Sequence, residues 1–212
     1  MTAPSCSTDD SNRASTSRRA LLRGLAIAPV ATSAIASPWT KALKSLHQRY
    51  DDEPLMLVRT KAGRSLSRDR YDSAEIAFAQ IEAGFFAQHV REALHQAGSI
   101  AKLALCAHLL DIGFPDDWNA VHIRQDIAKA LAYANATGFG HDCPDMARLA
   151  VILSPYWKWG YPHLIGDPPM DDGGFTPDRV RPLVRALLDR VADGTGHSRP
   201  QGFERRQREA RS

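Results

Sequence analysis

A nearly uninterrupted apolar run from Ile100 to Ile112 constrains the fold of this 212-residue chain more than any other segment. A helix over this run has almost no polar face, which is typical of a helix buried on all sides. The run is also shorter than the roughly 20 apolar residues that a membrane-spanning helix needs. We therefore expect it to form the central helix of a protein core. Its apolar residues include Leu103, Ala104, Leu105, Cys106, Ala107, Leu109 and Leu110.

The segments on both sides of this run have apolar residues at helical spacing and end at Gly or Pro signals. The apolar stripe shifts near Gly84, which predicts a kink there or a helix covered on two sides. Gly98-Ser99 is expected to separate that helix from the central one, and Pro182 to delay the start of the last helix. Besides the central helix, the expected helices cover residues 37–50, 72–97, 118–137, 144–155 and 177–194.

The predicted fold is mainly α, a single domain of about five to six helices around a buried central helix. Residues 55–68 also allow a small β-hairpin, with residues 61–64 as its turn. The sequence has no internal repeat and no alternating βαβ pattern. We expect the domain to cover residues 37–196 and the Arg-rich residues 197–212 to form a basic, disordered tail.

An arginine pair near the N-terminus is the most specific motif of the sequence. It is followed by a short apolar stretch that ends with the small residues Ala34 and Ala36. The pattern resembles a twin-arginine export signal, which implies that residues 1–36 are removed by a cut before Ser37. The resemblance implies the bacterial export machinery as a partner and the periplasm as the destination, and a cytoplasmic chain with a false signal is the alternative. The motif consists of Ser17, Arg18, Arg19, Leu21, Leu22 and Arg23.

The charge balance gives little reason to expect nucleic-acid binding. The chain has 27 Lys and Arg against 24 Asp and Glu, a formal net charge of +3. The basic excess lies in residues 1–36 and 197–212, so the domain between them is slightly acidic. Nucleic acid is therefore an expected partner only for a cytoplasmic chain, through its basic tail. No transmembrane span is expected.

Residues that bind metals in other proteins occur here in small groups. A carboxylate and a histidine three residues apart share one helix face, but helical di-metal sites use two such pairs. A cysteine and a histidine two residues apart point in nearly opposite directions from a helix. A third group lies at an expected helix start, where capping is the alternative to metal binding. We predict no metal and no cofactor. The groups are Glu92 with His95, Cys106 with His108, and His141 with Cys143 and Asp145.

Two further patterns concern histidine and cysteine side chains. Three histidines lie three or four residues from a carboxylate, and we expect them to form exposed helical pairs. Cys106 is expected to be a buried free thiol, and a disulfide with Cys143 after export is the alternative. The three pairs are His47 with Asp51, His108 with Asp111, and His122 with Asp126.

An aromatic loop near residue 160 is the best candidate for a binding surface. Flat, rigid side chains beside charged residues suit contact with a carbohydrate, a peptide or a protein partner. The alternative is that these side chains fold back and cover the core. The candidate residues are Tyr156, Trp157, Trp159, Tyr161 and His163.

These patterns predict an exported helical protein that acts as a binding or envelope-associated module, with an unknown ligand or protein partner. A periplasmic enzyme with a site in residues 141–172 is one alternative. The sequence contains no nucleophile elbow, phosphate-binding loop or dinucleotide fingerprint, so it leaves open whether the protein is an enzyme. A cytoplasmic protein associated with nucleic acid is the other alternative.

Overall fold

Helix α4 (Val90–Ile112) is buried along most of its length. The computed structural model describes residues 39–160 and 171–200. The apolar run of the sequence forms the C-terminal half of α4, in which every residue except Lys102 and Leu103 is buried. The expected buried central helix is therefore present.

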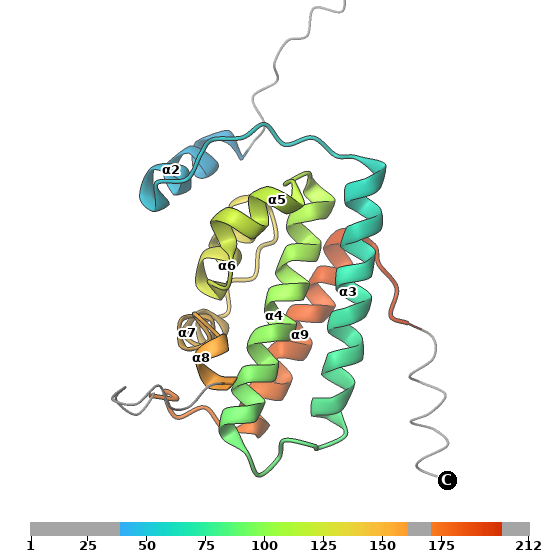
Figure 1. Cartoon of the computed structure of the whole chain (residues 1–212), viewed down its shortest axis with the longest axis vertical. Helices are drawn as coiled ribbons and strands as arrows, with labels where there is room; N and C mark the ends of the chain where they lie inside the picture. The colour runs from blue at the N-terminus through green and yellow to red at the C-terminus, as the bar shows by residue number, and fades with distance from the viewer. Residues whose placement is uncertain (1–38, 161–170, 201–212) are drawn as a thin grey trace, which may run out of the picture. The chain divides into compact units, whose positions relative to one another are not determined.

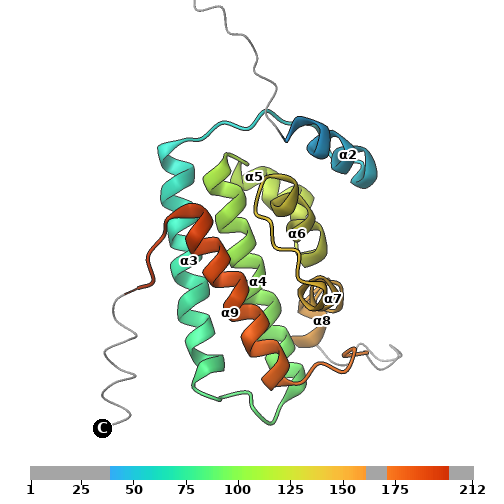
Figure 2. The same ribbon diagram turned by 180° about the vertical axis from the view of Figure 1, so that it is seen from behind.

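Two more long helices, α3 (Lys61–Glu82) and α9 (Pro177–Thr195), run alongside α4 and also contact each other (Figures 1 and 2). A buried ion pair joins them. Arg185 of α9 donates two hydrogen bonds to the Glu75 carboxylate of α3, at 2.8 and 2.5 Å. The Tyr71 hydroxyl donates a third to the same carboxylate, at 2.7 Å. Each charge is thus compensated, which a buried carboxylate requires.

Shorter helices lie on the side of α4 away from α3 (Figure 1). Helix α2 packs on α6 at one end of this group. The described residues all fall within one compact unit, residues 37–212. The helices are α2 (Thr40–Tyr50), α5 (Asp116–Trp118), the π-helix η2 (Asn119–Ile123), α6 (Ile127–Ala136), α7 (Pro144–Ile152) and α8 (Trp157–Gly160).

The prediction of a mainly helical protein is confirmed, but the described residues form eight α-helices rather than five or six. Two expected helices are divided. The chain turns between α3 and α4, where Gly84 has a φ of +79°, a conformation that glycine adopts readily. The expected helix 118–137 breaks at Arg124, which separates η2 from α6.

Gly98-Ser99 does not end a helix, contrary to the prediction. Both residues lie inside α4. Gly98 faces Tyr156 so closely that a Cβ added to it would lie 2.1 Å from the Tyr156 Cβ. The glycine is therefore needed for close packing between two segments, a role that local sequence cannot distinguish from a helix stop.

The β-hairpin near residues 55–68 is not confirmed. Residues 53–60 form neither a helix nor a strand, and α3 begins at Lys61. The Thr60 hydroxyl accepts a hydrogen bond from the Gly63 amide at 2.9 Å, so the expected turn residues form the capped first turn of a helix. A buried stripe that includes Tyr71, Phe78 and Ile81 then fixes α3 on the core.

The last helix begins at Pro177, so Pro182 lies inside it and does not delay its start. Past the helix end, His197 is buried and its Nε2 lies 2.8 Å from the Ser67 hydroxyl of α3. Within the described parts of the chain, every helix is too short or too polar to cross a lipid bilayer. The arginine motif at residues 17–23, Ala34, Ala36 and residues 201–212 lie outside the described residues.

Candidate functional site

The aromatic residues predicted as a binding surface do not share one environment. Trp159 is only 4% exposed, and its indole N–H donates to the Ile152 carbonyl at 3.0 Å. Tyr156 is half-buried and packs against Gly98 of α4. Trp157 is 36% exposed. These positions favour a core-covering role for Trp159 and Tyr156, whereas Trp157 lies at the surface. Tyr161 and His163 lie outside the described residues.

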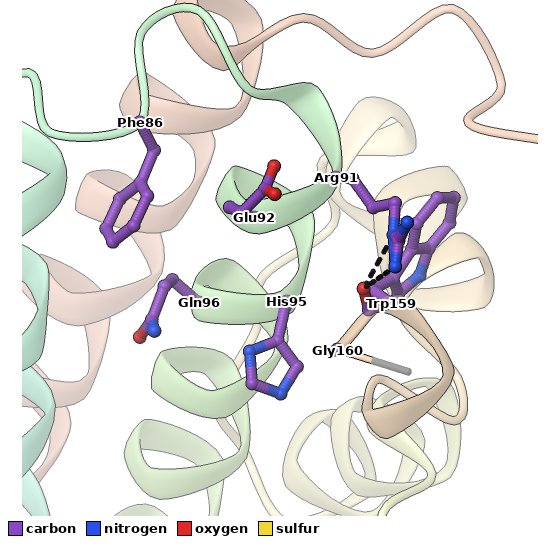
Figure 3. A pocket seen from close by; sticks show the side chains of 7 residues that line it. All are labelled: Phe86, Arg91, Glu92, His95, Gln96, Trp159 and Gly160. Carbon is purple, nitrogen blue, oxygen red and sulfur yellow. Dashed lines mark hydrogen bonds between the residues drawn. The ribbon is translucent and has the colours of Figure 1, made fainter. Parts of the chain in front are cut away.

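A pocket of about 310 Å³ lies where α8 meets the start of α4 (Figure 3). The Arg91 guanidinium closes one side by donating two hydrogen bonds to the Trp159 carbonyl, at 2.9 and 3.2 Å. Glu92 and His95 both line the pocket, but Figure 3 shows their side chains pointing in different directions. The pair therefore does not form a shared binding site for a metal ion.

The other cysteine and histidine groups also stay apart. Across the described residues, no three His, Cys, Asp or Glu side chains are arranged to hold a metal ion. Cys106 and Cys143 are both free thiols, so the alternative of a disulfide bond between them does not hold in this structure. Burial raises the pKa of the Cys106 thiol to about 11, which makes it an unreactive core residue.

A larger pocket of about 570 Å³, called here the His122 pocket, opens between three separate parts of the chain. The end of α2 contributes Tyr50, the η2–α6 junction contributes most of the wall, and residues 154–157, which lead into α8, contribute the remainder. The lining residues are Tyr50, His122, Ile123, Arg124, Gln125, Asp126, Lys129, Ser154, Pro155 and Trp157.

Unusual backbone structure forms the wall of the His122 pocket. The π-helix η2 ends at Ile123, and the next residue, Arg124, has φ 51° and ψ −104°. Such conformations are costly for a residue with a side chain and are found preferentially at functional sites, as are short π-helical segments. Asp126 then caps α6 by accepting a hydrogen bond from the Lys129 amide at 2.8 Å.

A second segment of the wall is held by Ser154. Its hydroxyl donates to the Ala150 carbonyl at 2.7 Å and accepts from the Ala128 amide at 3.0 Å. These bonds tie the chain after α7 to the first turn of α6. Both bonds hold the fold together. The Ser154 hydroxyl already donates its proton to the Ala150 carbonyl, so this proton is not available to a ligand.

Beneath the pocket, the buried carboxylate of Asp52 is the centre of a polar network. Lys129 donates to Oδ1 at 2.7 Å, and Tyr133 donates to Oδ2 at 2.6 Å. His122 Nδ1 lies 3.1 Å from Oδ1 and, because a carboxylate only accepts, the imidazole donates there. His47 Nδ1 lies 3.2 Å from the Tyr133 oxygen and donates to it, because the single hydroxyl proton of Tyr133 is used on Asp52.

Burial and hydrogen bonding act in opposite directions on this network. Burial raises the pKa of the Asp52 carboxyl, but hydrogen bonds from Lys129, Tyr133 and His122 outweigh it and hold that pKa below its usual range. Burial, followed by the nearby Asp52 carboxylate, raises the pKa of Tyr133. Burial lowers the pKa of His47. Asp52 is therefore the ionised member that orients its neighbours.

The histidines of this network have partners other than those that helical spacing predicts. His47 and His122 were expected to pair with Asp51 and Asp126 on exposed helix faces, but both belong to the Asp52 network. His108 is buried rather than exposed, and neither of its ring nitrogens has a hydrogen-bond partner among the described residues. Helical spacing detects only partners on the same helix, whereas Asp52 lies on the segment between α2 and α3.

Lys129 and Tyr133 were absent from the predicted site residues. Their spacing of four residues on α6 places them on one face of that helix. This is the only signal in the sequence that connects them, and it does not identify Asp52. Comparison with known protein families, characterised proteins and solved structures finds no match for this chain.

Proposed function

We propose that this chain is an exported helical binding protein and that its ligand binds in the His122 pocket. The observation that carries the proposal is the combination of an open pocket with a strained wall and an ordered polar network beneath it. His122 and Lys129 line the pocket and are both held by Asp52. Groups that are fixed before a ligand arrives cost little entropy on binding.

Export rests on the N-terminal motif. Ser17, Arg18 and Arg19, with the small residues Ala34 and Ala36, support a twin-arginine signal that delivers a folded protein to the periplasm. Fractionation of cells that express a C-terminally tagged chain tests this, beside a variant with Arg18→Lys and Arg19→Lys. We expect a periplasmic product that begins at Ser37 and disappears in the variant. An uncut cytoplasmic chain in both strains would overturn export and favour the nucleic-acid alternative.

Binding is tested by native mass spectrometry of the full-length protein purified under mild conditions. We expect a retained small molecule, or one taken up from a low-molecular-weight extract of the same cells. Trp157→Ala should weaken retention, because Trp157 lines the pocket and is partly exposed. The matched control is Val151→Ala, which removes an exposed apolar side chain of α7 that does not line the pocket. A protein that takes up no small molecule under either condition would overturn the binding function.

An enzyme is the second candidate, and the Asp52–His122 contact favours it. Asp52 accepts from Nδ1 of His122, so Nε2 is the nitrogen left for other partners of this pocket-lining ring. A carboxylate that orients an imidazole in this way is a recurring arrangement for a general base. Chemical change of the bound molecule by the wild-type protein, absent from His122→Gln, would distinguish the enzyme from a binding protein.

A further inference from the structure

Arg124 brings to the His122 pocket a positive charge that no described residue compensates. Its Nε donates to the Val121 carbonyl at 2.8 Å, and this bond restricts the orientation of the guanidinium group. Among the described residues, its two terminal nitrogens have no hydrogen-bond or ion-pair partner. A guanidinium with both terminal nitrogens available binds a carboxylate through two parallel hydrogen bonds.

Asp126 brings a negative charge to the same wall. Oδ1 accepts from the Lys129 amide, whereas Oδ2 has no partner among the residues that the structure describes. Asp126 and Arg124 are two residues apart, yet they form no ion pair with each other. The positive φ of Arg124 and the capping bond of Asp126 hold the backbone of the two residues in different conformations.

The other hydrogen-bonding side chains of the Asp52 network at the pocket already have a partner. Lys129 is bound to Asp52 at 2.7 Å, and His122 shares the same carboxylate oxygen. Counting only residues 39–160 and 171–200, a ligand therefore meets one free positive group and one free negative group. Tyr50 and Trp157 add aromatic surface to the lining, and a volume of about 570 Å³ is within the range that small-molecule sites have.

We propose that the His122 pocket binds a small zwitterion that carries a flat ring, namely an aromatic α-amino acid. The ligand carboxylate binds Arg124, its ammonium group binds Asp126 and its ring packs on the aromatic side chains. This inference rests on the proposed binding function and adds the class of ligand. A purely anionic ligand would leave Asp126 unpaired, and a purely cationic ligand would leave Arg124 unpaired.

Isothermal titration calorimetry with L-phenylalanine and three analogues tests the ligand class on the full-length protein. 3-Phenylpropionate keeps the ring and the carboxylate, phenethylamine keeps the ring and the ammonium group, and L-alanine keeps both charges without the ring. We expect L-phenylalanine to bind about tenfold tighter than each analogue, because one charge-assisted contact or the ring contact is lost in each. Equal affinity for L-phenylalanine and either single-charge analogue would overturn the proposal.

Two substitutions that remove a charge assign each ligand contact to its residue. Arg124→Gln should weaken L-phenylalanine and 3-phenylpropionate about tenfold and leave phenethylamine unchanged. Asp126→Asn keeps the oxygen that caps α6, so it should weaken L-phenylalanine and phenethylamine and leave 3-phenylpropionate unchanged. Arg181→Gln, at an exposed position on α9, is the control and should bind all four compounds like the wild type. Loss of all binding with no such selectivity would contradict the assignment.

The outcomes also separate this inference from the binding function itself. A protein that retains a cellular small molecule but binds none of the four compounds would overturn the ligand class and leave the binding function standing. A protein that retains nothing and binds none of them would overturn both. The titrations with the four compounds use the wild-type protein, so their result does not depend on the folding of any variant.

Discussion

Tyr156 packs on Gly98 with no room for a side chain between them, since a Cβ on Gly98 would lie 2.1 Å from the Tyr156 Cβ. This contact joins the middle of the central helix to the segment that carries Trp157 and Trp159. That segment contributes to both pockets, because Trp159 lines one and Trp157 the other. The position of the pocket walls thus depends on a glycine in the core.

Gly98→Ala should destabilise the protein despite the higher helix propensity of alanine. Alanine is better than glycine in a helix by about 1 kcal/mol, but overpacking costs about 1 to 3 kcal/mol and here forces Tyr156 away from α4. The free energy of unfolding in urea measures the change. Gly194→Ala is the control, because its Cβ would lie an ordinary 3.6 Å from His108 Nδ1, and it should be neutral or stabilising. Equal effects at the two positions would contradict the packing argument.

The two tryptophans of α8 should differ strongly in their effect on stability. Trp159→Ala removes a buried indole and its hydrogen bond to Ile152, so we expect a loss of about 3 to 5 kcal/mol. Trp157→Ala removes a side chain that is 36% exposed, and we expect less than about 1 kcal/mol. Thermal and urea unfolding of the two variants provide the measurement. Similar losses for both would show that Trp157 also belongs to the core.

Asp52→Asn should destabilise the protein by about 3 kcal/mol, because it leaves the buried Lys129 ammonium group without its counter-charge. Lys129→Met alone should cost a similar amount for the converse reason. The double variant should lose less than the sum of the two single variants, because no unpaired charge remains. A double-mutant cycle from urea unfolding measures this coupling. Additive losses would mean that the ion pair contributes nothing beyond its separate side chains.

His108 should make the protein less stable in mild acid. Burial lowers its pKa from 6.5 to about 4, so the unfolded chain takes up a proton there more readily than the folded protein. Stability is therefore lost as the pH falls from 6.5 toward 4, by about 2 kcal/mol between pH 7.5 and pH 5 for this residue. Urea unfolding at the two pH values measures the difference.

His108→Leu should remove that share of the pH dependence with little loss at pH 7.5, because neither ring nitrogen has a hydrogen bond to lose among the described residues. Burial also lowers the pKa values of His47, His141 and His197, so part of the pH dependence should persist in this variant. His89→Leu, at an exposed position between α3 and α4, is the control and should keep the wild-type dependence. An unchanged dependence in His108→Leu would exclude His108 as its source.

Local patterns were sufficient for much of the fold. The run from Ile100 to Ile112 predicted the buried helix, and Pro144 predicted the start of α7. These features depend on neighbours a few residues away, because apolar spacing and first-turn chemistry act within one helix. The same local signals failed at Gly98, where the deciding neighbour is Tyr156.

The candidate site depended on tertiary structure. Asp52 is 77 residues from Lys129 and 70 from His122, and the sequence pattern instead predicted a local partner for His122, Asp126. The sequence by itself determined that the chain is mainly helical and that the helix over residues 100–112 is buried, because burial of an apolar face is encoded in periodic spacing. Only the packing of α2 and η2 on α6 decided which polar side chains meet, because the hydrogen bonds of a buried carboxylate join residues that are distant in sequence.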